Sequence, residues 1–178
     1  MIPLSDLGKR ICILGPSNSG KSTLAKAIGR KCNFDVIHLD QLHHLPNTDW
    51  QVRPTDEFIA LHNAAIAGDQ WVMEGNYSIC MGQRFERATG LILLDVSTLT
   101  SLRRYVNRTL FEVSRYGGLE GSQDSVKWVM IHHIIARTPK NRVRYERMFQ
   151  ALTLPKIRLS SVREINRFYK RWELQPHP

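Results

Sequence analysis

Short runs of apolar residues recur along the chain, and longer stretches with helical spacing separate them. Residues 11–14 read Ile-Cys-Ile-Leu, and residues 91–94 read Leu-Ile-Leu-Leu. Apolar runs of this length that end at a glycine or an acid are typical of buried strands. The pattern predicts five strands, at residues 9–14, 34–40, 71–75, 91–96 and 156–159.

Helical periodicity fills the intervals between these strands. Leu24, Ala25, Ala27 and Ile28 repeat at the spacing of one helix face. Strands that are apolar throughout and alternate with helices indicate a mostly parallel sheet covered on both faces. The sequence therefore predicts a three-layer α/β fold around a five-stranded, mostly parallel sheet. The predicted helices cover residues 22–31, 55–68, 101–111 and 162–172.

Acidic residues follow three of the predicted strands. Asp40, Glu74 and Asp95 stand near the ends of the second, third and fourth strands, and the first strand runs into a glycine-containing loop. In open α/β sheets, ligands bind beyond the carboxyl ends of the strands. We therefore expect one ligand site at this edge.

The loop after the first strand matches the phosphate-binding pattern GxxxxGK[ST] over residues 15–22. The glycines permit backbone conformations in which successive N–H groups face an anion, and the next helix adds its N-terminal N–H groups. Lys21 would reach the outer phosphates, Ser22 would contact magnesium, and Thr23 would contact an inner phosphate. The motif predicts binding of a nucleoside triphosphate, ATP with Mg²⁺. The predicted nucleotide-binding residues are Gly15, Pro16, Ser17, Asn18, Ser19, Gly20, Lys21, Ser22 and Thr23.

The net charge of +9 admits two kinds of partner. A basic surface can bind nucleic acid, whereas arginines also bind polyphosphate ligands. Most lysines and arginines lie beyond residue 102 and are spread over the whole C-terminal part. This spread favours phosphate binding by several elements over a nucleic-acid tail.

Other features exclude several classes of protein. No apolar run approaches the roughly 20 residues that span a bilayer, and no signal peptide is evident, so we expect a cytoplasmic protein without a membrane partner. The three cysteines are far apart, which argues against a disulfide framework or a zinc site. The pairs His43-His44 and His132-His133 lack a further ligand, and adjacent residues on a helix point in different directions, so a metal site there is not favoured.

The sequence resembles the small P-loop kinases of the adenylate-kinase type, and is most similar to the bacterial group named topology modulation proteins. The resemblance implies one kinase-like domain over residues 1–178, with an acceptor-side insertion at 41–69 and a lid at 109–136. It rests on the phosphate loop, the stretch 38–40 followed by Trp50, the stretch Trp-Val-Met-Glu-Gly-Asn-Tyr at 71–77, and the stretch 93–95 before an arginine-rich helix.

The resemblance also implies roles for single residues. Glu74 matches the acid that positions magnesium-bound water, and Asp40 matches the acid that meets either the acceptor hydroxyl or the magnesium shell. Arg104 and Arg108 match two arginines, four residues apart, at the lid entrance. A second pair of lid arginines would come from Arg137 and Arg142, with Arg144 as an alternative.

One departure concerns the acceptor. Arg53 is the only lysine or arginine between Lys31 and Arg84, so the arginine pattern that would hold a nucleoside monophosphate is missing. We expect ATP-dependent phosphoryl transfer to a small-molecule acceptor, such as a nucleoside or nucleotide. The alternatives are a nucleotide-dependent regulatory protein and a nucleic-acid-binding protein with slow ATP hydrolysis.

Overall fold

The computed structural model describes residues 2–111 and 141–176, with the side chains of 108–111 excepted. The strands are β1 (Arg10–Leu14), β2 (Asp35–His38), β3 (Trp71–Glu74), β4 (Gly90–Leu94) and β5 (Lys156–Leu159). The helices are α1 (Lys21–Cys32), α2 (Leu39–His43), α3 (Thr55–Ile66), α4 (Met81–Arg87), α5 (Thr98–Phe111), a helix over residues 141–151, and α7 (Val162–Arg171). Two 3-10 turns, η1 (Leu4–Leu7) and η2 (Ser78–Cys80), complete the described elements.

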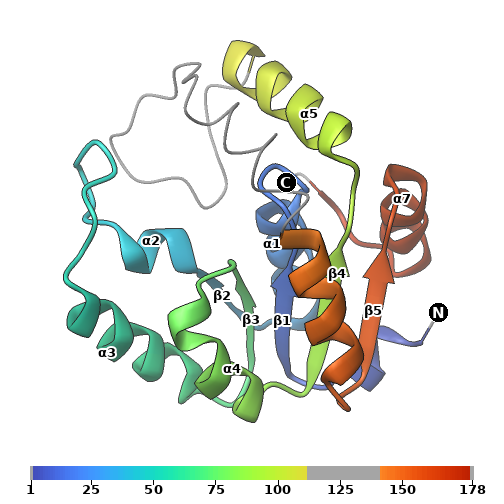
Figure 1. The fold of residues 1–178 in the computed structure, drawn as a ribbon. Coiled ribbons are helices and arrows are strands. Elements are labelled where there is room, and N and C mark those ends of the chain that lie inside the picture. The colour runs from blue at the N-terminus through green and yellow to red at the C-terminus, as the bar shows by residue number, and fades with distance from the viewer. Residues whose placement is uncertain (1, 112–140, 177–178) are drawn as a thin grey trace.

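The five strands form one sheet in the order β2-β3-β1-β4-β5 (Figure 1). All four strand pairings are parallel, which confirms the predicted α/β class and makes the described sheet wholly parallel. β1 lies at the centre of the sheet, with β3 and β2 on one side of it and β4 and β5 on the other. The loop that follows β1 therefore lies between the two halves of the sheet. Such a position is the usual ligand site of this architecture.

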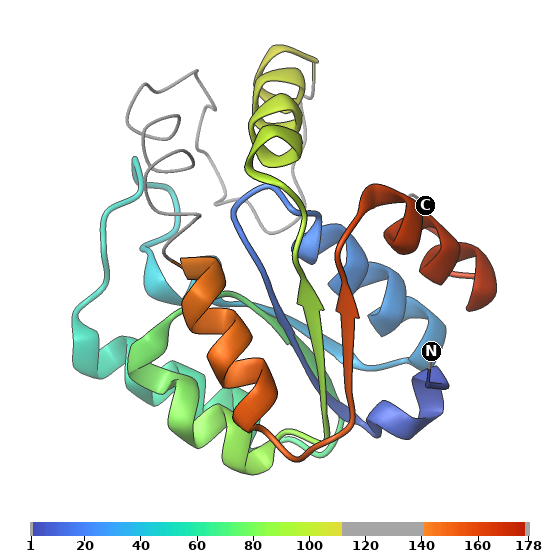
Figure 2. The ribbon, with the colours of Figure 1, turned by 45° about the vertical axis from the view of Figure 1, so that its right-hand side comes forward.

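Alternate side chains along each strand enter two apolar layers. In β1, Ile11 and Ile13 pack with α1 and α7, whereas Cys12 and Leu14 pack with α3, α4 and the 141–151 helix. Figure 2 shows these two groups of helices on opposite faces of the sheet. Trp71, which the sequence places in a strand, is 1% exposed and belongs to the second layer. No described helix is long and apolar enough to cross a membrane.

The second strand is shorter than predicted. It ends at His38, and the chain turns directly into α2, so Asp40 lies in the first turn of a helix and not at a strand end. The amide of His44 closes this helix on the carbonyl of Asp40 at 3.2 Å. The hydrophobic pattern did not reveal this change from strand to helix. Leu39 is the buried residue of α2, and because it directly follows β2 it reads as part of the strand.

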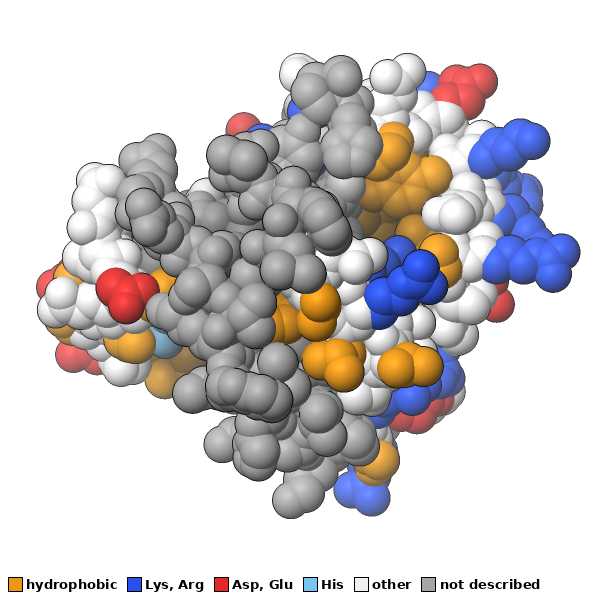
Figure 3. All heavy atoms as spheres, turned by 90° about the horizontal axis from the view of Figure 1, so that it is seen from above, with side chains coloured by type: hydrophobic (Ala, Val, Ile, Leu, Met, Phe, Trp, Pro, Cys, Tyr) orange, Lys and Arg blue, Asp and Glu red, His pale blue; other side chains and the backbone are white. Residues whose placement is uncertain are grey.

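Charge is unevenly divided over the carboxyl edge of the sheet, which Figure 3 shows from above. Among the described residues, lysine and arginine side chains gather mostly on the side of α7, and acidic side chains and a histidine appear on the side of α2 and α3. Exposed Arg163, Arg167, Lys170 and Arg171 belong to α7. The basic surface therefore lies away from the acceptor-side segment.

Candidate active site

The phosphate loop is fixed tightly against the neighbouring strand ends. Gly15 has a φ of 148°, and a Cβ at this position would lie 2.3 Å from the carbonyl oxygen of Leu94. The side chain of Asn76 binds the same residue twice: its Nδ2 donates to the Gly15 carbonyl at 2.7 Å, and its Oδ1 accepts from the Gly15 amide at 3.3 Å. The start of the loop is therefore held between β4 and the segment after β3.

Several polar groups converge in the loop. Lys21 Nζ donates to the carbonyl of Pro16 at 2.9 Å, which curls the lysine back over the loop. Asn18 Nδ2 and Ser19 Oγ are buried and have no hydrogen-bond partner among the residues that the structure describes. Buried polar atoms without partners are rare in native proteins and call for an explanation. A polyphosphate bound in the loop fits these groups, together with the lysine and the N-terminal amides of α1.

Glu74 connects the loop to β2. Its Oε1 accepts hydrogen bonds from Ser22 Oγ and from His38 Nδ1, each at 2.9 Å. The side chains of His38 and Glu74 are only 6% and 4% exposed. The pairing follows from strand register, because His38 in β2 lies directly opposite Glu74 in β3. Sequence analysis named Glu74 and Ser22 but missed the pairing of Glu74 with His38, which depends on the register of the two strands.

The environment of Glu74 keeps its carboxylate ionised. Burial acts to raise the pKa of Glu74, but the hydrogen bond from His38, the charge of Lys21 and the hydrogen bond from Ser22 outweigh burial and lower it. An ionised carboxylate and a serine hydroxyl are hard oxygen donors of the kind that Mg²⁺ prefers. The described residues contain no cluster of three or more His, Cys, Asp or Glu that could hold a metal. Magnesium bound to nucleotide usually takes only one or two protein groups, so this donor set fits it.

A second carboxylate lies on the acceptor side. Tyr77 donates its hydroxyl hydrogen to Asp40 Oδ1 at 2.7 Å. Burial and the charge of Asp40 raise the pKa of Tyr77, so the phenol stays protonated and keeps donating. Because Tyr77 follows Asn76 directly, the same short segment binds Gly15 and Asp40. Asp40, predicted from sequence, is thereby fixed to the segment that clamps the phosphate loop.

The predicted arginines fall into three groups. Arg104 of α5 reaches the phosphate loop, where its Nη1 donates to the carbonyl of Ser19 at 2.6 Å. Arg108 lies one turn further along α5, but its side chain is outside the described residues, as is the whole of Arg137. Arg142 and Arg144 lie on the exposed surface of the 141–151 helix.

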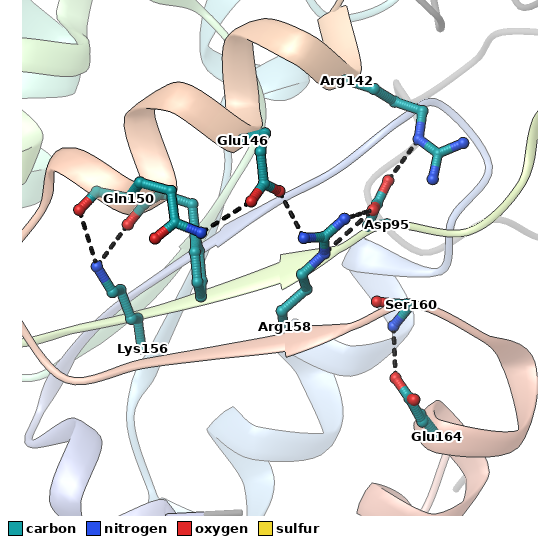
Figure 4. Close-up of polar contacts among 9 residues, drawn as sticks. Asp95, Arg142, Glu146, Gln150, Lys156, Arg158, Ser160 and Glu164 are labelled. Carbon is teal, nitrogen blue, oxygen red and sulfur yellow. Dashed lines mark hydrogen bonds and ion pairs between the residues drawn. The ribbon is translucent and has the colours of Figure 1, made fainter.

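Arg142 belongs to an ionic cluster at the end of β4 (Figure 4). Its Nε donates to Asp95 Oδ1 at 2.6 Å, while Arg158 of β5 donates to Asp95 Oδ2 and pairs with Glu146 at 2.6 Å. Asp95 thus connects β4, β5 and the 141–151 helix through its two arginine partners, which is a structural role. Sequence reasoning missed Arg158, which becomes significant only through this packing.

Replacing Asp95 by asparagine is expected to lower the free energy of unfolding at pH 7 by about 1–2 kcal/mol, a modest value because both arginines are well exposed. Burial acts to raise the pKa of Asp95, but hydrogen bonds and charge from Arg142 and Arg158 hold it below its ordinary value. The stability that these pairs contribute is therefore present above the unfolded pKa and is lost as pH falls through the folded pKa. Thermal unfolding at pH 7 and near pH 3 measures this; an equal difference at both values contradicts it.

Comparisons with known proteins bear on the fold. No protein-family model matches the chain, and no curated protein matches it. A shikimate kinase from Bacteroides thetaiotaomicron superposes with a TM-score of 0.55 at 19% identity, covering 93% of this chain and 99% of that one. A shikimate kinase from Acinetobacter baumannii, in complex with shikimate, gives 0.55 at 12% identity, covering 95% and 93%. The chain therefore has the same α/β fold as these small P-loop kinases.

Proposed function

We propose that this protein is a kinase that uses ATP and Mg²⁺ to phosphorylate a hydroxyl group of a small molecule. One observation carries the proposal: the phosphate loop, the Ser22–Glu74 pair and the Asp40–Tyr77 pair meet at one edge of the sheet. A site that only binds nucleotide needs the first two of these. The third places a carboxylate on the side where an acceptor would lie. That two proteins of the same fold are kinases supports this reading.

On the donor side, the loop amides and Lys21 would hold the triphosphate, and Ser22 with Glu74 would hold magnesium. Bound magnesium supplies positive charge that offsets the negative charge of the transferring phosphoryl group. Arg104 lies against the loop and would add a further positive charge. Arg108, Arg137 and Arg142 remain proposed lid residues, since arginine forms bidentate contacts with phosphate.

On the acceptor side, Asp40 would accept the proton of the attacking hydroxyl. Tyr77 donates to Oδ1 of this carboxylate, and Oδ2 would be the oxygen that meets the acceptor hydroxyl. The hydrogen bond from Tyr77 fixes the orientation of the carboxylate before the acceptor binds. Positioning of this kind is the main contribution a protein makes to phosphoryl transfer.

The proposal is tested by ADP formation from ATP and Mg²⁺ in the presence of small hydroxyl compounds. We expect one class of acceptor to raise turnover well above the hydrolysis seen with water alone, and this increase to depend on Lys21. Turnover that no acceptor raises, together with intact ATP binding, would favour the nucleotide-dependent regulatory protein.

His38 offers a separate test of the magnesium site. Because an ionised Glu74 can only accept, the His38 Nδ1 carries the hydrogen and holds the carboxylate in place. Substituting His38 by glutamine removes a donor at the Nδ1 position, whereas asparagine keeps one there. We expect His38→Gln to weaken Mg²⁺-dependent ATP binding about tenfold, and His38→Asn to weaken it less.

Calorimetric titration of ATP at several Mg²⁺ concentrations measures this effect without relying on turnover. ATP binding in the absence of Mg²⁺ serves as the control and should be the same in wild type and both variants. Equal Mg²⁺ dependence in all three proteins contradicts the assigned role of His38.

A further inference from the structure

The acceptor-side segment carries a charge opposite to that of the whole protein. Between Leu39 and Ile66, the chain holds four acids and one arginine, which gives −3, whereas the full chain carries +9. In Figure 3, the lysine and arginine side chains gather near α7 and not on the described part of this side. Surface charge of one sign concentrates ligands of the other sign and repels those of its own. The acids are Asp40, Asp49, Asp56 and Glu57, and the arginine is Arg53.

Arg53 holds this segment together. Its Nε donates to the carbonyl of Leu42 at 2.9 Å, and its Nη2 donates to the carbonyl of His44 at 3.5 Å. Its Nη1 pairs with Glu57 at 3.5 Å. All three nitrogens are therefore engaged within the segment. These contacts use three of the five N–H groups of the guanidinium and fix its orientation within the segment.

Arg84 lies below the site and is fully buried. Its Nη1 donates to the carbonyl of Gly75 at 3.1 Å, and its exposed fraction is 0%. No ion pair with an acid is formed by Arg84 within the described ranges 2–111 and 141–176. Its Nε and Nη2 are buried and have no hydrogen-bond partner among the described residues, but the side chain has no exposed surface through which an acceptor could contact it.

The tyrosine that contacts Asp40 belongs to a group of packed aromatic rings. The ring of His43 lies 4.4 Å from that of Tyr77 and 5.0 Å from that of Phe58, measured between centroids. Burial and the neighbouring His44 lower the pKa of His43, so this ring is neutral at neutral pH. Phe58 is buried in the core, whereas His43 and Tyr77 are partly exposed, so the described acceptor side offers a carboxylate and the rings of these two residues. Such groups bind neutral ring compounds and cations, since aromatic faces attract positive charge.

We propose that the phosphoryl acceptor is a hydroxyl compound without an anionic group, either uncharged or carrying an amine. The inference rests on the proposed kinase function and names the substrate class of the same site. Nucleoside monophosphates and carboxylic acids are excluded by it. A nucleoside, an uncharged sugar or an amino alcohol satisfies it.

The test compares acceptors in matched pairs that differ only by an anionic group. Suitable pairs are a nucleoside and its 5′-monophosphate, a cyclic triol and its carboxylated analogue, and an amino sugar and its sugar acid. ADP formation with ATP and Mg²⁺ gives kcat/KM for each compound. We expect the member without the anion to be at least about tenfold better in the productive pairs, a difference of about 1.4 kcal/mol. Salt should raise the KM of an amine-bearing acceptor and leave that of an uncharged acceptor nearly unchanged.

The possible failures are distinguishable. A preference for the monophosphate or the carboxylate overturns the inferred acceptor class while the kinase function stands. If no member of any pair stimulates ADP formation, the proposed kinase function is wrong, and so is the inferred acceptor class.

An Arg53→Gln variant adds a control on the role of that arginine. We expect it to lower the melting temperature while leaving the discrimination between paired acceptors unchanged, because Arg53 fastens the segment and binds no acceptor. If the variant selectively raises KM for anionic acceptors, Arg53 binds them and the inference is wrong.

Discussion

Replacing Lys21 by alanine is expected to reduce acceptor-dependent ADP formation by about 10³-fold. Lys21 lies at the start of α1, and its ammonium already points back over the phosphate loop, where it donates to Pro16. In phosphoryl transfer, the protein mainly positions the reactants and offsets charge that is spread over the phosphoryl oxygens. Loss of the one loop lysine removes a positive charge at the place where that charge is needed.

Two measurements separate this role from folding. Thermal unfolding without nucleotide should be nearly the same in Lys21→Ala and wild type, whereas stabilisation by ATP with Mg²⁺ should shrink in the variant, because a ligand stabilises the folded state according to its affinity. Lys9→Ala is the matched control, since Lys9 is exposed and precedes β1 at the opposite edge of the sheet. Unchanged ATP binding and unchanged turnover in Lys21→Ala would contradict the phosphate-loop assignment.

The features that sequence predicted best are those that a local pattern determines. The phosphate loop depends on consecutive residues, and β4 and β5 were placed within two residues because short apolar runs report buried strands directly. Asp40 was expected at a strand end, but the chain enters α2 at Leu39. Periodicity over so few residues does not distinguish a buried strand from a short buried helix.

The features that sequence missed depend on contacts between distant segments. His38 became part of the site because the register of β2 and β3 places it opposite Glu74. Asn76 clamps Gly15 across 61 positions of the chain, and Arg158 meets Asp95 across 63. No spacing rule links such residues in a single sequence. Acids and glycines after the strands indicated which edge of the sheet holds the site. The hydrogen-bond partners of each acid could be identified only in the folded structure.

The nucleotide-binding side and the acceptor side of the site provide different kinds of evidence about function. The donor side follows from a motif whose chemistry is general, and in the structure Lys21 contacts the phosphate loop and Ser22 contacts Glu74. On the acceptor side, the resemblance to nucleotide kinases implied an anionic acceptor among others, whereas the charges and rings of residues 39–66 favour one without an anion. The segment 74–77 belongs to both sides: Glu74 and Asn76 serve the donor, and Tyr77 serves Asp40.

Substituting Asp40 by asparagine is expected to lower kcat by about 10²–10³-fold while changing the KM for ATP little. Asparagine keeps an oxygen that accepts from Tyr77, so the local structure is retained, but the amide cannot take the proton of the acceptor hydroxyl. Tyr77→Phe is the matched variant: it keeps the ring and removes only the hydrogen bond at 2.7 Å. Because it leaves the carboxylate in place but less firmly oriented, we expect a loss of about tenfold.

The order of these two effects is the decisive measurement. Steady-state kinetics with a productive acceptor should give a much larger loss for Asp40→Asn than for Tyr77→Phe, with ATP binding by calorimetry preserved in both. If Asp40 served only to fasten α2 to Tyr77, Asp40→Asn, which keeps an acceptor for this hydrogen bond, would reduce turnover and melting temperature no more than Tyr77→Phe, which removes the bond. A difference of ten- to a hundredfold in kcat at similar stability therefore identifies Asp40 as the group that receives the acceptor proton.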